Sequence, residues 1–320
     1  MIKKPLEQLF DAMHHGKYAY ADFLSGTLEN NFRRQIIGPS TRRREILVPN
    51  KKLKDFLVFL NLFVFDHLPV CRDAVFSYRK GATPMQAVEI HRNSRYFLQM
   101  DIKNFFPSIN RALVERALLK GGETTPVADI QERKERILDM VCIDGHLPLG
   151  FPTSPPISNA ILNGFDVEMQ GYCKRIGVRY TRYSDDLIFS SESPIPQQLP
   201  EEVAALIRRH SDDVLSIHSG KTKLFRTGGK IKILGMMILP NGRITIDSKI
   251  KSELEVLLHF YITDKSKFFD LCEGDEQAGI ERAAGYLTYA NSVDTEYIGR
   301  LRKKFGAATV DMVLHRSYPQ

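Results

Sequence analysis

The sequence predicts an α+β fold in which a mostly antiparallel sheet is backed by helices and followed by a helical C-terminal part. Two observations predict the sheet: an apolar strand pattern at 95–102 and two strand patterns that flank "SDD" at 184–186. A third observation predicts the helical end, because apolar residues beyond residue 247 recur at helical spacing. We place the boundary between the two parts near residue 240.

The N-terminal part is expected to alternate short strands with helices. Three arginines at 42–44 precede a short apolar run that Pro49 ends, which predicts a strand entered from a basic loop. The run at 95–102 predicts a largely buried strand with Asp101 inside it. The other elements expected before residue 145 are helices at 53–67, 84–90, 109–122 and 128–143, and a short strand within 74–83 that leads into a basic turn.

The remaining elements lead from a loop to the helical end. They are a Pro/Gly/Ser-rich loop at 147–159, a helix from near Ser158, strands on both sides of "SDD", a helix near 200–210, and two strands joined at Asn241 and Gly242. Beyond them, Ile250, Leu254 and Leu257 fall on one helical face. The stretch "EYIGRLRKKFG" repeats this pattern and ends at Gly306, a typical helix stop.

Composition indicates a globular protein with a polyanionic partner. Of the 320 residues, 43% are hydrophobic and 26% are charged, and the formal net charge is +7. This excess favours nucleic acid as a partner, although a merely basic protein would have the same total. The four cysteines lie far apart without a CxxC pair, which suits a reducing cytosol. The start lacks the apolar core of a signal peptide, so we expect a cytoplasmic protein without a membrane partner.

Asp185 and Asp186 lie at the tip of the expected hairpin. A lone acidic turn is most often a solvated surface feature, because aspartate is a common turn residue. Asp101 changes this interpretation, since a carboxylate inside an apolar strand needs a partner. A salt bridge to an arginine would satisfy Asp101 alone, but a divalent cation would relieve the repulsion among all three carboxylates. Two such ions would clamp the attacking and leaving oxygens of a phosphoryl displacement.

Several motifs, in order along the chain, resemble those of reverse transcriptases. "YSDD" is similar to the YxDD signature, "DIKNFFPSI" to the aspartate motif before it, and "LPLGFPTSPPISN" to the loop between them. Later, "SGKTKL" resembles the lysine motif and "KILGMMI" the hydrophobic hairpin of the family. The resemblance covers roughly residues 40–320 and implies a right-hand polymerase. It implies an N-terminal extension at 1–39, fingers at 40–94 and 119–158, a palm at 95–118 and 159–239, and a helical thumb at 240–320.

The compact length and "FPTSPPISN" look most like the retron reverse transcriptases of bacteria. This resemblance implies an RNA-directed DNA polymerase that copies a structured non-coding RNA into branched, RNA-linked single-stranded DNA (msDNA) in anti-phage defence. The implied partners are the cognate RNA and its cDNA, dNTPs, an effector protein from the same locus, and host RNase H for template removal. Two Mg²⁺ ions are the implied cofactors, with Mn²⁺ as a substitute. The chain departs from the family at Leu149, where glutamine is common, and it keeps only His91 and Gly235 of two retron elements.

The resemblance also assigns catalytic roles to residues. Asp101, Asp185 and Asp186 are the implied metal ligands, with Asp186 acting more indirectly. Lys221 is the implied proton donor to the departing pyrophosphate, with Lys223 as its rival and a solvated lysine as the plain alternative. Phe106, five residues after Asp101, would clash with a ribose 2′-hydroxyl and so select deoxynucleotides, unless it is a core residue.

Other residues are implied to bind nucleotide or nucleic acid. The implied nucleotide-binding residues are Arg44, Arg79, Phe106, Gly150 and Pro152. The implied nucleic-acid-binding residues are Tyr183, Gly235, Arg300, Arg302, Lys303 and Lys304. Arginine suits phosphate by its fork of donors, and glycine permits a close approach of the backbone. For the basic residues a solvated helix or loop face remains the alternative.

Two other functions stay open from the sequence. The same fold could belong to a template-independent or protein-primed defence polymerase, which the sequence of its DNA product would distinguish. The chain could instead be a catalytically silent RNA-binding subunit that controls an effector. The three aspartates argue against this second alternative, because a binding protein does not need converging carboxylates.

Overall fold

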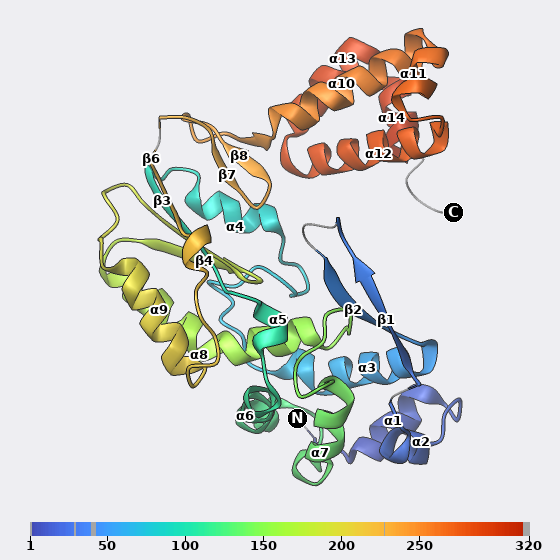
Figure 1. Ribbon diagram of the computed structural model, residues 1–320, viewed down its shortest axis with the longest axis vertical. Coiled ribbons are helices and arrows are strands. Elements are labelled where there is room, and N and C mark those ends of the chain that lie inside the picture. Colours follow the sequence, from blue (N-terminus) through green and yellow to red (C-terminus); the bar gives the residue numbers. More distant parts are fainter. Residues whose placement is uncertain (1, 29, 40–42, 227, 316–320) are drawn as a thin grey trace. The chain divides into compact units, whose positions relative to one another are not determined.

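The structure is a computed structural model that describes residues 2–28, 30–39, 43–226 and 228–315. The chain forms two compact units. The first contains Met1–Thr83 and Phe97–Leu224, and the second contains Pro84–Tyr96 and Phe225–Gln320. Each unit is described here by itself (Figure 1).

The first unit mixes helices with two sheets. Its helices are α1 (Leu6–His14), α2 (Tyr20–Ser25), α3 (Lys51–Phe63), α5 (Phe105–Ser108), α6 (Arg111–Gly121), α7 (Ile130–Val141), α8 (Ser154–Arg175) and α9 (Leu199–His210), with the 3-10 helices η2 (Phe65–His67), η3 (Gly122–Thr124) and η4 (Ser219–Lys221). Its strands are β1 (Phe32–Ile37), β2 (Arg44–Pro49), β3 (Tyr96–Asp101), β4 (Arg179–Tyr183), β5 (Asp186–Ser191) and β6 (Lys223–Arg226), of which β3 and β6 cross the boundary between the units.

The larger sheet carries the predicted strands around "SDD". Its strand order is β4-β5-β3-β6, and β4 and β5 form an antiparallel hairpin in which Tyr183 is opposite Asp186. Strand β5 is buried at every position after Asp186. Helix α8 packs against β4 and α9, so helices back this sheet as predicted (Figure 1).

The second sheet of this unit is an antiparallel pair formed by β1 and β2, with Arg34 opposite Leu47. Strand β2 confirms the strand expected before Pro49. Strand β1 was not predicted, because its residues after Phe32 are all exposed and show no alternation of apolar and polar positions. The strand expected within 74–83 is wrong: this segment makes a single parallel bridge from Val75 to Arg182.

Helix α8 begins at Ser154, earlier than the predicted start near Ser158. The two prolines at 155 and 156 suggested a loop, but they occupy the first turn of the helix. Proline is tolerated there because the first N–H groups of a helix have no partner within the helix. The loop before α8 is therefore shorter than expected.

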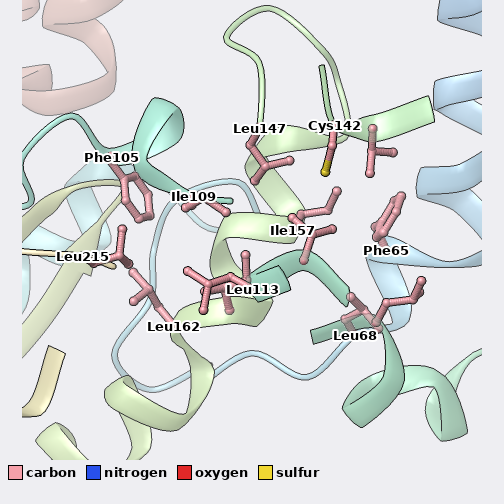
Figure 2. Packing of buried hydrophobic residues seen from close by; sticks show 14 of the residues in the cluster. Phe65, Leu68, Phe105, Ile109, Leu113, Cys142, Leu147, Ile157, Leu162 and Leu215 are labelled. Carbon is pink, nitrogen blue, oxygen red and sulfur yellow. The ribbon is translucent and has the colours of Figure 1, made fainter. Parts of the chain in front are cut away.

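The core of the first unit gathers residues from α5, α6 and α8. Figure 2 shows Phe105 near Leu215 and Ile109, and Leu113 of α6 between Ile157 and Leu162 of α8. All of these side chains are buried. Burial of each contributes about 1.5–3 kcal/mol relative to exposure. This packing fixes the segment that follows Asp101.

The second unit contains a small sheet and the helical C-terminal part. Its helices are α4 (Pro84–His91), α10 (Ser248–Thr263), α11 (Lys265–Leu271), α12 (Glu276–Val293), α13 (Thr295–Phe305) and α14 (Ala307–His315), and its sheet has the order β7 (Ile231–Ile233), β8 (Met236–Ile238) and β9 (Ile244–Ile246). Two strands were predicted here, but Leu234 and Gly235, both with positive φ, form a turn that divides the first of them. Gly242 turns the chain from β8 to β9 as predicted, with φ of 78°.

The helices of the second unit have their own core, to which Leu254, Leu257, Leu287, Ile298 and Leu301 belong. The predicted helical part from residue 240 therefore lies within this unit, which also takes in Pro84–Tyr96 and begins its second segment at Phe225. The carbonyl of Arg92 lies so near Gly242 that a Cβ there would be 3.3 Å from the oxygen, so the end of α4 packs on this turn. No helix in the described ranges is long and apolar enough to cross a membrane.

Candidate active site

Neighbouring strands bring Asp101 and Asp185 together. Asp101 is the last residue of β3 and is 9% exposed. The N–H of Ile102 donates a hydrogen bond of 3.1 Å to the carbonyl of Asp185, at the tip of the β4–β5 hairpin. The two aspartates, far apart in sequence, therefore meet at one end of the sheet, as the sequence predicted.

A third segment, at 216–221, runs beside the end of β3. The carbonyl of Ser216 accepts from the N–H of Lys103 at 2.9 Å, and the N–H of His218 donates to the carbonyl of Asp101 at 2.7 Å. These bonds place Lys221 so that its Nζ lies 2.9 and 3.0 Å from the two carboxylate oxygens of Asp101. Lys223, its rival, is exposed on β6. Lys221 is thus the lysine of this motif that lies at the aspartates.

Burial and the charges of neighbouring residues shift the pKa of Asp186. Asp186 is exposed as a residue, but the protein around its carboxyl removes enough solvent to raise its pKa. The charges of Asp185 and Asp101 raise this pKa further, and Lys221 opposes them, with a net value of about 6. Asp101 and Asp185 are therefore close enough for their charges to disfavour the ionised form of Asp186.

The donor set suits a hard divalent cation, because carboxylate oxygens are the ligands that Mg²⁺ prefers and a cation would relieve this repulsion. In the described part of the chain, however, no three His, Cys, Asp or Glu side chains are already arranged to hold a metal ion. The ammonium of Lys221 supplies the positive charge at Asp101 in this arrangement. Metal ligation by the aspartates stays a prediction.

A cavity of about 760 Å³ adjoins the aspartates within the first unit. Asp101, Asp185 and Lys221 line it, and Asp186 does not. From the β1–β2 hairpin come Arg34, Arg43 and Arg44, and from other segments Tyr78, Phe106, His146, Leu149 and His218. The lining thus contains both cations and carboxylates, a set that suits a ligand carrying phosphate together with a metal ion.

Phe105 and Phe106 differ in their surroundings. Both line the cavity, but Phe105 is 4% exposed and belongs to the core, whereas Phe106 is only partly buried and packs against the core. The ring centroids of Phe106 and Tyr78 are 6.2 Å apart. Phe106 thus lies at the cavity beside Tyr78, and its contact with the sugar of a nucleotide stays a prediction.

Several cavity residues were missed in the sequence. Arg34 pairs with Glu45 at 2.6 Å and with Asp144 at 2.7 Å, at the edge of the cavity. In the sequence, Arg34 was marked only by the basic stretch "NFRRQ", which has no strand pattern. Tyr78 was missed because its segment is neither strand nor helix. Arg42, from the basic run before Pro49, lies outside the described residues.

The sequence model of the family described as "Reverse transcriptase (RNA-dependent DNA polymerase)" matches residues 38–238. The chain belongs to this family. Retron Ec83 reverse transcriptase from Escherichia coli is 27% identical over 75% of this chain and 76% of the relative. Retron Ec73 reverse transcriptase from the same species is 25% identical, over 82% and 83%. These relatives confirm a retron-type reverse transcriptase, an RNA-directed DNA polymerase.

A solved structure supports the fold of this reverse transcriptase. Telomerase from Candida tropicalis, in complex with a TWJ fragment of telomeric RNA, matches with a TM-score of 0.50 at 12% sequence identity. The match covers 93% of this chain and 58% of the telomerase chain. Similarity at this level concerns the fold alone, and it agrees with the predicted α+β polymerase fold.

Three residues predicted to bind the nucleotide and one predicted to bind nucleic acid lie outside the cavity lining. Arg79 donates to the carbonyl of Arg72 at 3.1 Å, and Pro152 accepts from Asn61. Gly150 has φ of 101° and lies against strand β2, where a Cβ would be 2.4 Å from the carbonyl oxygen of Leu47. Its close approach is thus to protein backbone. Tyr183, the fourth, is partly buried on β4.

The residues predicted to bind nucleic acid near the C-terminal end lie in the second unit. Arg302 pairs with Asp311 at 2.8 Å, and Lys304 with Glu255 at 2.6 Å. Arg300 lies over the ring of Tyr297, and Lys303 is exposed. Gly235 has φ of 84° in the turn between β7 and β8. Two of the four cations are therefore committed to acidic partners, and contact with nucleic acid stays a prediction.

Proposed function

We propose that this reverse transcriptase is the polymerase of a retron. It copies a structured non-coding RNA of its own locus into single-stranded DNA that stays joined to the RNA, and this product serves anti-phage defence together with an effector protein. Similarity to retron enzymes supports the choice of template. The observation that carries DNA synthesis is the cavity in which Asp101, Asp185, Lys221 and the hairpin arginines meet.

The proposed reaction is the attack of a primer hydroxyl on the α-phosphate of a dNTP. A bond forms between the hydroxyl oxygen and the α-phosphorus, and the hydroxyl proton passes to solvent. The bond from that phosphorus to the bridging oxygen breaks, and pyrophosphate leaves. Asp101 and Asp185, with Asp186 beside them, would hold Mg²⁺. When bound, this metal neutralises phosphate charge and orients the reacting oxygens.

The chain's own residues would do the remaining work. Arg43 and Arg44 bind the triphosphate, because guanidinium groups match phosphate oxygens in geometry and charge. Lys221 supplies a proton to the leaving pyrophosphate, and its place in the cavity supports this role. Phe106 closes the space beside the sugar. Catalysis then depends mainly on positioning and on neutralising charge.

The net charge of +7 supports binding of the RNA and the growing DNA. Removal of the copied template is assigned to a host RNase H. The RNA, its cDNA, the host RNase H and the effector all belong to the proposal, as does the use of two magnesium ions.

The test is to express the protein with its native locus and to sequence the nucleic acid that copurifies with it. A single cDNA that matches one RNA and is joined to it through a 2′–5′ bond is expected. DNA of random sequence would contradict the proposal and favour a template-independent polymerase.

A variant with Asp185→Asn and Asp186→Asn should lose dNTP incorporation and still bind the RNA. Asp311→Asn, which changes an aspartate of the second unit in the same way, is the matched control and should keep activity. Equal activity of the double variant and the parent would overturn the assignment of these aspartates.

A further inference from the structure

Tyr78 contacts two other residues that line the candidate active site, Phe106 and Ser184. Its ring lies 6.2 Å from the ring of Phe106, centroid to centroid, at an interplanar angle of 58°. Its hydroxyl lies 2.8 Å from the hydroxyl of Ser184, the residue directly before Asp185, and the two share a hydrogen bond. The side chain of Tyr78 thus contacts both Phe106 and the turn that carries Asp185.

Both ends of this contact have an uncommon backbone conformation. Tyr78 has φ of 55° and Ser184 has φ of 59°, in the left-handed region that bulky residues rarely adopt. Such strain persists only where the surroundings impose it, and it is concentrated at functional sites. The N–H of Ser184 donates to Oγ of Ser77 at 2.7 Å, in a buried position. The segment around Tyr78 and the turn are therefore held together by two adjacent residues.

A buried ion pair also holds the turn at Ser184. Arg182 and Asp166 are fully buried and lie 2.7 Å apart. Arg182 also donates to the carbonyl of Ser184 at 3.0 Å and to the side chain of Asn159 at 3.1 Å. Asn159 in turn donates to the carbonyl of Ser77 at 2.9 Å. These bonds hold the backbone of Ser184 and of Ser77, the residue before Tyr78. The contact between the two hydroxyls lies at the cavity.

We propose that Tyr78 is a positioning residue of this active site. Its hydroxyl holds Ser184 and so fixes Asp185, and its ring supports Phe106, so that the reacting phosphate and the selected sugar keep a constant separation. This inference rests on the proposed function and adds a residue to it. Tyr78 acts through Ser184 and Phe106, and it needs no chemistry of its own.

A double-mutant cycle tests the hydroxyl contact. Tyr78→Phe keeps the ring and removes the hydrogen bond, and Ser184→Ala removes the same bond from the other side. Each should lower the rate of dNTP incorporation about fivefold, the usual weight of one neutral hydrogen bond. The apparent affinity for dNTP should stay near that of the parent, because the cavity keeps its shape. The double variant should be no slower than either single variant.

Tyr18→Phe is the matched control, since it also removes one tyrosine hydroxyl bond, to Asp55 at 2.8 Å. It should keep the parental rate. A parental rate for Tyr78→Phe, or effects that multiply in the double variant, would overturn the inference. Tyr78→Leu, which removes the ring, should in addition raise incorporation of ribonucleotides relative to deoxyribonucleotides.

A second measurement separates this inference from the proposed function. Hydrogen exchange of the backbone at 183–187 should be faster in Tyr78→Phe than in the parent and unchanged in Tyr18→Phe. This result does not depend on activity. If the parent incorporates no dNTP on any template, the proposed function fails, and unchanged exchange would overturn the role of Tyr78 separately.

Discussion

Phe105 and Phe106 are adjacent in the chain but serve different parts of the molecule. Phe105 packs in the core with Leu215 and Ile109 (Figure 2). Phe106 is only partly buried and lies beside Tyr78 at the cavity. Sequence alone left open which of the two rings would be structural. Burial decides it, because Phe105 is 4% exposed and belongs to the core, whereas Phe106 is only partly buried.

This difference predicts opposite outcomes for two similar substitutions. Phe106→Ala should raise ribonucleotide incorporation relative to deoxyribonucleotide incorporation and leave stability nearly unchanged, because it opens the space beside the sugar. Phe105→Ala should instead lower the free energy of unfolding by about 3–5 kcal/mol, as expected for a cavity in a packed core. Single-nucleotide incorporation and urea unfolding of both variants measure the two effects. An unchanged nucleotide ratio in Phe106→Ala would remove its proposed role.

Among elements, the loop before α8 is fixed by its contact with β2. Leu47 donates its N–H to the carbonyl of Leu149 at 2.7 Å, and Gly150 lies against the backbone of Leu47. The hairpin that supplies the cavity arginines is thus held by a glycine that no other residue could replace without movement.

Gly150→Ala should therefore weaken dNTP affinity and destabilise the protein, because a Cβ cannot fit against the carbonyl of Leu47. Gly145→Ala is the matched control, since Gly145 also has positive φ but has no atom within 4 Å of a Cβ. It should show only the cost of the backbone conformation, about 1–2 kcal/mol. Thermal unfolding and dNTP titration of both variants measure the difference. Equal behaviour would show that the close approach is unimportant.

In the second unit, Asp294 joins β9 to the start of α13. Its carboxylate accepts hydrogen bonds from Thr245, Arg243 and Lys251, and from the N–H of Tyr297 at the start of the helix. Burial alone would raise its pKa, but these hydrogen bonds outweigh burial and lower the pKa to about 2. The charged form of Asp294 is thus stabilised by folding.

A carboxylate with a lowered pKa gives stability that is present above the unfolded pKa and is lost as pH falls toward the folded one. For Asp294 this window runs from about pH 5 down to the folded pKa of about 2. At neutral pH the ionisation contributes about 2 kcal/mol. Urea unfolding of Asp294→Asn and the parent at several pH values should show a stability gap that narrows as pH falls. A constant gap would contradict this account.

The sequence predicted most elements of the fold, because their apolar patterns reflect burial. Strands β3, β4 and β5 and helices α3, α6 and α9 lie close to the predicted ranges. It missed β1, whose side chains bury no face, and the extra turn at Leu234 and Gly235, which interrupts a continuous apolar run. The start of α8 was misplaced because proline signals both loops and first turns.

For the whole molecule, the sequence predicted a cavity residue only when that residue belonged to a recognisable motif. Asp101, Asp185 and Lys221 were found in this way. Arg34 lies in a segment without a strand pattern, and Tyr78 lies in one that was wrongly predicted as a strand. Their places depend on tertiary packing. The same holds for Gly150, whose nearest neighbour is the backbone of Leu47.

The second unit is built from two segments of the chain. The first is the short segment Pro84–Tyr96, which contains α4 and comes directly before most of β3. A deletion that removes everything after Leu224 would therefore leave α4 behind without the turn at Gly242 on which its end packs. Chimeras that exchange the C-terminal portion between related enzymes should fold better when residues 84–96 come from the same donor. Strand β3, which ends in Asp101, begins where this segment ends, so a poorly matched graft would also disturb the end of the sheet that carries Asp101.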